Sequence, residues 1–259
     1  MKIMFLSYSP RGKPRDKYDE ETERILNSYA SPGTQVVLAH PEDLGGGVID
    51  KRLSAELAIN GLHHILRVPA LIKKTIEAER EGFNAVVQSN TYDPGVEEAR
   101  LAVRIPVVGL LRATCHVAAC LANRIGITIL VEAMLPYARK ILHSYGLDPF
   151  IVGIKALGMY EEGGLENVRD SIKARVVELA KEFKEEGAEV LIPLGGRVFP
   201  TAVSCEEIEA EAGIPVLNTK AIGIQFAEML VRCRMGQSPL AYPCKVKFSP
   251  EDITKRIFV

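Results

Sequence analysis

Short runs of apolar, largely β-branched residues alternate along the chain with longer segments in which apolar residues recur every three or four positions. The first pattern predicts buried strands, and the second predicts amphipathic helices. The predicted strands are Lys2–Ser7, Thr34–Ala39, Ala85–Ser89, Val107–Leu110, Ile125–Leu130, Phe150–Ile154, Val190–Pro193 and Val216–Leu217. Strands that alternate with helices are typical of an α/β protein with parallel sheet and helices on both faces.

The clearest predicted helix has one apolar face, with charged residues on the other. Its apolar face is formed by Leu165, Val168, Ile172, Val176, Leu179 and Phe183. Right-handed crossovers between parallel strands bring the carboxyl ends of all strands to one edge of a sheet. We therefore expect the functional residues in the loops that directly follow the strands.

An internal repeat joins two of these strand-and-loop units. Glu81–Asn90 and Glu186–Gly195 each end a helix with an acid and a glycine, run through a strand and enter a loop. In both cases an acidic helix and an Ile-Pro-Val strand follow. Alternatively, any two βα units look alike at this level. The repeat favours two similar lobes and gives Asn90 and Gly195 equivalent positions.

The fold class expected from this pattern is α/β, with two pseudosymmetric, doubly wound, parallel-sheet lobes and a ligand site in the cleft between them. The first lobe is predicted to comprise residues 1–111 together with about 219–259. The second lobe is predicted to comprise residues 112–218. The segment after Gly236, which contains several prolines, is predicted to be irregular.

Composition excludes several classes of function. With 47% hydrophobic residues among 259, the chain can bury a full core, and its net charge of -1 gives no reason to expect nucleic acid. The most apolar region, Val103–Ala138, is interrupted by charged residues, so we expect no membrane partner. The five cysteines form no CxxC pair, and no secretory signal precedes them. Reduced thiols and a cytoplasmic location are therefore expected.

The segment Asn84–Arg124 resembles the corresponding part of hydantoin and allantoin racemases. These enzymes belong to the aspartate/glutamate racemase superfamily, together with arylmalonate decarboxylase and maleate isomerase. The resemblance covers roughly residues 80 to 235. It rests on Asp93-Pro94-Gly95, the Ile105–Gly109 strand, the helix bearing His116, Leu135-Pro136, Tyr145–Leu147, Gly187–Val190 and Leu194-Gly195.

The resemblance implies two lobes that hold a small carbon-acid ligand between them. Racemisation in this family uses one cysteine from each lobe, because one group removes a proton from one side and another returns a proton on the opposite side. A thiol suits both tasks, since its pKa is easily lowered.

This sequence departs from that pattern at both cysteine positions. Asn90 occupies the first position, and the second falls at Gly195 or within one residue of it. Arg112 stands where hydantoin racemases have a glutamate, and Arg197 follows the second loop. These changes indicate a pocket rebuilt for a different ligand or reaction, without the two-thiol mechanism.

Several residues are candidates for ligand binding or catalysis. A loop that opens a helix presents backbone N–H groups to an anion or a polarised carbonyl. Asn90 adds a neutral donor there, or alternatively caps the next helix. Arg112 and Arg197 suit a carboxylate. The remaining expected ligand-binding residues are Ser7, Ser9, Thr91, Tyr92, Thr114, Gly195 and Gly196.

For proton transfer the sequence offers few groups. His116 is the candidate, although a buried histidine packed in the core is the alternative. Cys115 and Cys120 are predicted to pack in the core, and His63-His64 to lie on the surface. Asp93 is predicted to bond the local backbone of its turn. No P-loop, GxGxxG or zinc spacing is present, so we expect neither cofactor nor metal.

Three functions remain open. The first is an isomerase that acts on a small carboxylate or a hydantoin-like cyclic amide. The second is a cysteine-independent hydrolase or decarboxylase, which would rely on a polarised carbonyl and a positioned water. The third is a non-catalytic protein that binds small anions. The resemblance also implies a homo-oligomer, with the apolar segment Leu57–Ile72 as a candidate interface.

Overall fold

The structure of the chain is a computed structural model. It describes residues 1–10, 16–44, 52–53, 58–159, 165–196 and 198–257, with backbone alone for 165–167 and 254–257. Arg197 therefore lies outside the described residues, as does Leu57 of the candidate interface segment.

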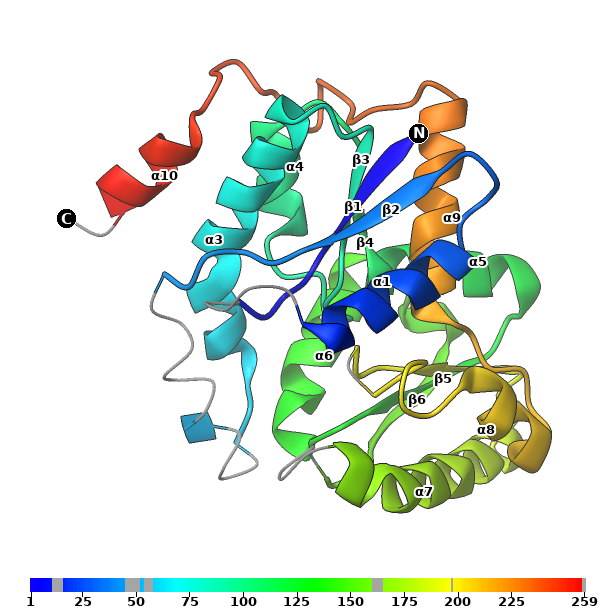
Figure 1. The fold of residues 1–259 in the computed structure, drawn as a ribbon. Helices are drawn as coiled ribbons and strands as arrows, with labels where there is room; N and C mark the ends of the chain where they lie inside the picture. Colours follow the sequence, from blue (N-terminus) through cyan, green and yellow to red (C-terminus); the bar gives the residue numbers. More distant parts are fainter. Residues whose placement is uncertain (11–15, 45–51, 54–57, 160–164, 197, 258–259) are drawn as a thin grey trace. The chain divides into compact units, whose positions relative to one another are not determined.

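Strands and helices alternate along the described chain (Figure 1). The strands are β1 (Lys2–Leu6), β2 (Gln35–Ala39), β3 (Ala85–Gln88), β4 (Val107–Gly109), β5 (Ile125–Ile129), β6 (Ile151–Ala156) and β7 (Val190–Pro193). The helices are α1 (Lys17–Ser28), α3 (Gly61–Arg80), α4 (Val96–Ala102), α5 (Leu110–Leu121), α6 (Leu135–Ser144), α7 (Leu165–Glu185), α8 (Cys205–Ala212), α9 (Thr219–Arg232) and α10 (Pro250–Ile257). Two short 3-10 helices are η1 (Glu132–Met134) and η2 (Asp148–Phe150).

The strands form two separate sheets in which every described pair is parallel. Sheet A has the order β2-β1-β3-β4, and sheet B has the order β6-β5-β7. A parallel bridge between Leu191 and Val216 adds a short fourth segment beside β7. Each sheet therefore begins from a central strand, gains one neighbour and then extends on the other side. The expected α/β fold class with parallel sheets is confirmed.

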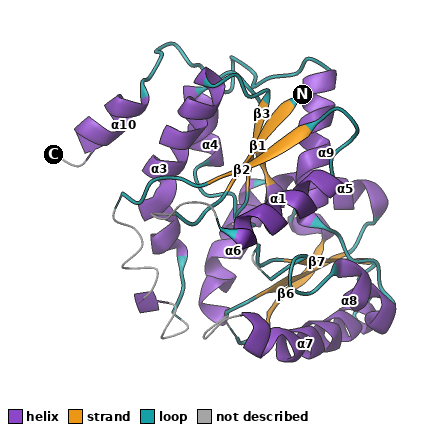
Figure 2. Ribbon diagram, in the orientation of Figure 1, coloured by secondary structure: helices purple, strands orange, loops and turns teal. Residues whose placement is uncertain are grey.

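The chain divides into two compact units, here called the first and second lobes. The first lobe contains Met1–Gly47, Leu62–Leu110 and Gly223–Val259, and sheet A lies in it. The second lobe contains Val48–Gly61 and Leu111–Ile222, and sheet B lies in it. Each lobe thus has its own sheet and its own surrounding helices (Figure 2).

Helices cover both faces of sheet A. On one face, Leu71 and Ala78 of α3 pack with Met4, Leu6 and Val86 of the sheet. On the other face, α9 approaches so closely that a Cβ at Gly223 would lie 3.2 Å from Val87 Cγ1. This double cover explains why the strands are continuous apolar runs, because both sides of each strand are buried.

In the second lobe, the long helix α7 packs on sheet B. The apolar face predicted from the sequence contributes Ile172, Val176, Leu179 and Phe183 to the core of this lobe. The Phe183 ring lies against the central strand, where a Cβ at Gly126 would come within 2.8 Å of it. The three- and four-residue spacing of apolar residues therefore identified the buried face of α7 correctly.

Two sequence predictions about the fold are wrong. Leu110 begins helix α5 and does not end a strand, because β4 passes into α5 without an intervening loop. The C-terminal segment is not irregular throughout, since Pro250–Ile257 forms α10. Among the described residues, no helix is both long enough and apolar enough to cross a membrane.

Candidate functional site

The carboxyl ends of β1 and β3 lie side by side in the first lobe. The backbone N–H of Tyr8 donates to Ser89 Oγ at 2.8 Å, which ties the two strand-end loops together. Ser7 Oγ donates to the Ser9 carbonyl at 3.3 Å, and both serines are half-buried. The structure therefore brings Ser7 and Ser9 next to the loop that contains Asn90, because parallel neighbours end at the same edge.

Asn90 is shaped by its own loop. Its N–H donates to Gln88 Oε1 at 2.7 Å, and its Oδ1 accepts from the Tyr92 N–H at 2.9 Å. The next helix begins at Val96 after Gly95, so the alternative that Asn90 caps this helix is wrong. Within the described part of the chain, Asn90 Nδ2 has no hydrogen-bond partner. This half-buried NH₂ group can donate to a ligand.

The loop after Asn90 is held down by buried residues. Thr91 is only 2% exposed and Asp93 only 6%. Asp93 adopts a left-handed backbone with φ of 52°, and a Cβ at Gly109 would lie 2.4 Å from its Cγ. The Asp93 carboxylate thus rests on the last residue of β4, immediately before α5 begins, where a negative charge is favoured. This packing supports a structural role for Asp93.

The prediction that His63 and His64 lie on the surface is wrong. They are 4% and 1% exposed, because the first turn of α3 is covered by aromatic residues from the strand-end loops. The His64 ring centroid lies 5.2 Å from that of Tyr8 and 5.5 Å from that of Tyr92. A histidine far away in the sequence therefore belongs to the same region as Asn90.

Burial controls the ionisation of His64. Desolvation, with help from the positive charges of His63 and Arg67, lowers the pKa of the His64 imidazole to about 2. At neutral pH this ring is therefore neutral, and it can exchange hydrogen bonds but cannot hold an added proton.

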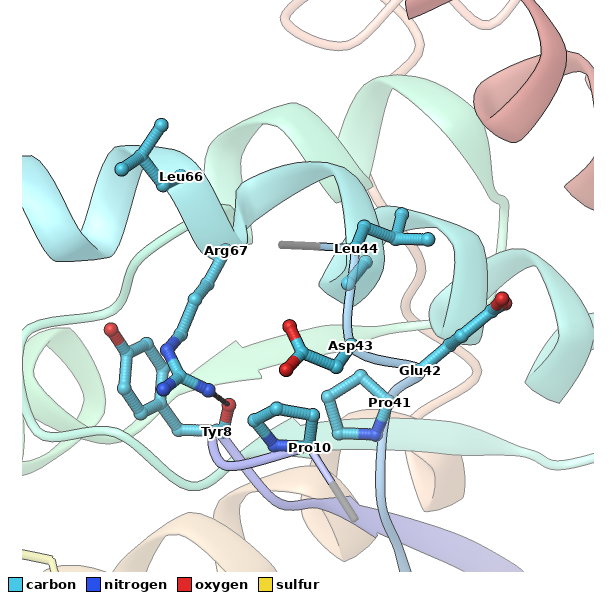
Figure 3. A pocket seen from close by; sticks show the side chains of 9 residues that line it. Tyr8, Pro10, Pro41, Glu42, Asp43, Leu44, Leu66 and Arg67 are labelled. Atoms are coloured by element: carbon cyan, nitrogen blue, oxygen red, sulfur yellow. Dashed lines mark hydrogen bonds between the residues drawn. The ribbon is translucent and has the colours of Figure 1, made fainter. Parts of the chain in front are cut away.

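Arg67 lines a small hollow in the same lobe (Figure 3). Its guanidinium carbon stands 4.7 Å above the centre of the Tyr8 ring, and Nη1 donates to the Tyr8 carbonyl at 3.5 Å. The Asp43 carboxylate points toward the same space. The hollow encloses about 200 Å³ including its open mouth, and its lining is Tyr8, Pro10, Pro41, Glu42, Asp43, Leu44, Leu66, Arg67 and Ala70.

Three sequence-predicted residues belong to α5, but their side chains have different surroundings. The half-buried Arg112 guanidinium stands 5.2 Å above the centre of the Tyr145 ring. Thr114 is fully buried, and its Oγ1 has no hydrogen-bond partner among the described residues. His116 is exposed, and its Nδ1–H donates to the carbonyl of Arg112 at 2.7 Å within the same helix.

These positions correct two further expectations. The alternative of a core histidine at position 116 is wrong, because α5 turns that side chain to the outside. Cys115 is buried as predicted, but Cys120 is exposed. The Ala-rich sequence of α5 does not reveal which of its faces is covered, so both errors have the same origin.

In the second lobe, the loop after β7 contains Gly195 and Gly196. Gly195 has φ of 142°, a conformation open to glycine, and a Cβ there would lie 3.1 Å from Leu130 Cδ2. Its carbonyl accepts from the N–H groups of Val198 and Phe199 at 2.8 and 2.9 Å. The tight-turn role of Gly195 is therefore evident from the backbone.

Backbone hydrogen bonds show that Asn90 and Gly195 are equivalent. In the first lobe, the N–H groups of Asn84 and Ser89 donate to β1 carbonyls at 2.8 and 2.9 Å. Glu189 and Leu194, which have the same spacing, donate to the Arg124 and Thr128 carbonyls at 2.8 Å each. Asn90 follows Ser89 directly, and Gly195 follows Leu194 directly. The pairing predicted from the internal repeat is thus correct.

One residue at this edge of sheet B, Lys220, is not among the candidates predicted from the sequence. Lys220 follows the bridge residue Val216 by one short turn and is only 5% exposed. Its Nζ donates to Thr201 Oγ1 at 2.5 Å, and Cys205 lies close enough to act on its charge. Lys220 follows the predicted strand Val216–Leu217 closely in the sequence, and this position after a strand could have identified it as a candidate.

The polar groups at the two strand edges are mostly neutral donors, with one buried amine. Among the residues that the structure describes, no three His, Cys, Asp or Glu side chains gather as a metal site. Neutral donors can stabilise an anion or an enolate, and an amine can accept a proton.

Several known proteins resemble this chain in sequence. A sequence model of the Asp/Glu/Hydantoin racemase family matches residues 22–227. A hydantoin racemase of Pseudomonas sp. (strain NS671) is 28% identical over 217 residues, covering 81% of this chain and 79% of its own.

Two solved structures share the fold. The allantoin racemase of Pseudomonas fluorescens superposes with a TM-score of 0.79 at 22% identity, covering 96% of this chain and 98% of its own. The allantoin racemase of Klebsiella pneumoniae gives a TM-score of 0.75 at 20% identity, with 96% of each chain covered.

Proposed function

The chain belongs to the Asp/Glu/hydantoin racemase family, and from this premise we propose that it is an isomerase for a small carboxylate or a hydantoin-like cyclic amide. The reaction moves the acidic hydrogen on the carbon next to a carbonyl. Because an enolate forms during this step, the protein must supply donors for the developing oxygen charge.

The observation that carries the proposal is the Asn90 amide at the end of β3. Its Oδ1 is engaged by the Tyr92 N–H, while Nδ2 has no partner in the described part of the chain. The side chain is thereby oriented and still has two N–H donors to offer. We assign Asn90 Nδ2 to the carbonyl oxygen of the substrate.

The positions of the cysteines argue against thiol catalysis. Cys115 and Cys120 lie along α5, and Cys233 and Cys244 lie in the C-terminal part of the first lobe. Cys205 begins α8, but burial raises the pKa of its thiol to about 12. A neutral thiol of this kind is a poor proton acceptor at neutral pH.

The proposal is tested with single enantiomers of 5-benzylhydantoin in D₂O. We expect loss of optical rotation together with loss of the C5–H signal in proton NMR. Asn90→Ala should slow this exchange by about 10²- to 10³-fold, as for the loss of one oxyanion donor. Asn123→Ala is the matched control, since Asn123 is exposed in the second lobe.

The other functions give different products. A hydrolase would open the ring to the N-carbamoyl amino acid, and an aryl-substituted malonate would reveal a decarboxylase by release of CO₂. A non-catalytic binder would show ligand-dependent thermal stabilisation with unchanged optical rotation. Any of these results without C5–H exchange would overturn the isomerase proposal.

We also propose a cytoplasmic homo-oligomer. Leu62 and Ile65 lie within the described part of the apolar segment Leu57–Ile72, on α3. Their side chains are 50% and 64% exposed. Sedimentation velocity should show an oligomer that Ile65→Glu weakens. A monomeric wild type would contradict this assignment.

A further inference from the structure

Lys220 stands at the carboxyl edge of sheet B, at the start of helix α9. Asn218 caps this helix, since its Oδ1 accepts from the Ala221 N–H at 3.0 Å. Lys220 therefore occupies the first turn, where the positive end of the helix disfavours a nearby cation.

The amine is also buried without a counter-ion. Lys220 is 5% exposed, and among the described residues no carboxylate pairs with its Nζ. Lysine is rarely buried in this way unless it is paired. The other described lysines with resolved shifts, Lys73, Lys155 and Lys173, each pair with a glutamate, and their pKa values are raised.

Among the described residues, the two groups that act on the Lys220 amine are uncharged near neutral pH. Thr201 accepts the hydrogen bond from Nζ, and the Cys205 thiol stays protonated because its pKa is raised to about 12. Glu206 and Glu209 of α8 act on Cys205, but they do not pair with Lys220. Burial therefore lowers the pKa of the Lys220 amine to about 8.

Two threonine hydroxyl groups belong to this part of the chain: Thr201 accepts from the amine, and Thr219 precedes Lys220 in the sequence. Thr201 is partly exposed, so the amine lies one side chain away from solvent. Thr219 is 2% exposed, and its Oγ1 has no hydrogen-bond partner among the described residues. A buried hydroxyl without a partner is unfavourable in an apoprotein, but it can bind a polar ligand.

We propose that Lys220 Nζ is a catalytic acid and base of the second lobe and acts on carbon acids such as 5-substituted hydantoins. This inference rests on the proposed isomerase function. The neutral amine accepts the proton from the carbon next to the carbonyl. The C–H bond breaks, an N–H bond forms, and the electron pair moves into the carbonyl to give an enolate. The ammonium then returns a proton to that carbon on the same face, which exchanges the hydrogen and restores the amine. Inversion follows when water protonates the opposite face and the resulting hydroxide takes the proton from the ammonium, which also restores the amine.

The test compares Lys220→Met with the control Lys140→Met, which alters an exposed lysine of the same lobe. Lys220→Met should slow C5–H exchange of 5-benzylhydantoin in D₂O by about 10²- to 10⁴-fold, the usual contribution of general acid–base catalysis. The control should retain its rate. Thermal unfolding should show that both variants are folded.

Three readouts separate a catalytic role from a structural one. The wild-type kcat/KM should rise with pH through about 8, following deprotonation of Lys220. Lys220→Arg should remain inactive because a guanidinium does not release its proton. Added propylamine should restore exchange in Lys220→Ala, and if that variant does not fold, Lys220→Met carries the test.

The outcomes distinguish the two proposals. If the wild type exchanges no C5–H, the isomerase function fails, and the role of Lys220 fails with it. If the wild type exchanges C5–H and Lys220→Met does so equally fast, only the role of Lys220 is overturned. A slow Lys220→Met variant, without amine rescue and with a wild-type profile flat between pH 7 and 9, also overturns it.

Discussion

His64 of the first lobe and Lys220 of the second lobe are both buried bases close to strand ends, but burial affects them differently. The pKa of His64 is lowered to about 2 and that of Lys220 to about 8. Each shift has desolvation as its largest cause. Because an ordinary amine begins from a much higher pKa, the same cause leaves it near the working pH.

The contrast shows how one physical effect can produce two roles. A general base works best when its pKa is close to the pH of the reaction, since it must both accept and release the proton. Lys220 meets this condition, whereas His64 does not. We therefore infer that His64 serves as a neutral ring packed against Tyr8 and Tyr92.

Exchanging the equivalent loop residues should give the largest effect on stability. Gly195→Asn forces a side chain onto a backbone with φ of 142° and against Leu130, so we expect a loss of about 3 kcal/mol or more. Asn90→Gly removes one hydrogen bond and should cost about 1 kcal/mol. Urea unfolding measures both, and equal losses would contradict the difference between the two loops.

Lowering the pH should show the effect of His64 on the stability of the fold. Its folded pKa lies below the unfolded value of 6.5, so the unfolded chain binds more protons and stability falls as the pH drops below 6.5. We expect His64 to account for about 2 kcal/mol of loss between pH 6.5 and 4.5. His64→Leu should flatten this slope.

Raising the pH should reveal Lys220 through a gain in stability. Its folded pKa is lowered from 10.5 to about 8, so stability rises between these values, where only the unfolded chain holds the proton. Relative to Lys220→Met, the wild type should gain about 2 kcal/mol between pH 8 and 9.5. A constant difference over this range would show that the amine is not desolvated.

The smallest expected free-energy difference is the one between the arginine–tyrosine contacts of the two lobes. Arg67 is 6% exposed and stands 4.7 Å above the Tyr8 ring, whereas the half-buried Arg112 stands 5.2 Å above Tyr145. Double-mutant cycles to alanine should give about 2 kcal/mol for the first pair and about 0.5–1 kcal/mol for the second. A stronger second pair would contradict the dependence on burial.

The sequence by itself determined most of the strands, their parallel pairing and the equivalence of Asn90 and Gly195. Strands buried on both faces appear as continuous apolar runs, and a repeated register survives in the spacing of the residues around it. These are local properties, so they can be read without knowing what packs against them.

Only the tertiary structure decided which polar side chains are buried. His63, His64 and Lys220 became buried because segments distant in the sequence cover them, while His116 and Cys120 face outward on a helix of largely apolar composition. Burial sets the pKa of an ionisable group through desolvation. The groups able to move protons could therefore be identified only after the chain had been folded.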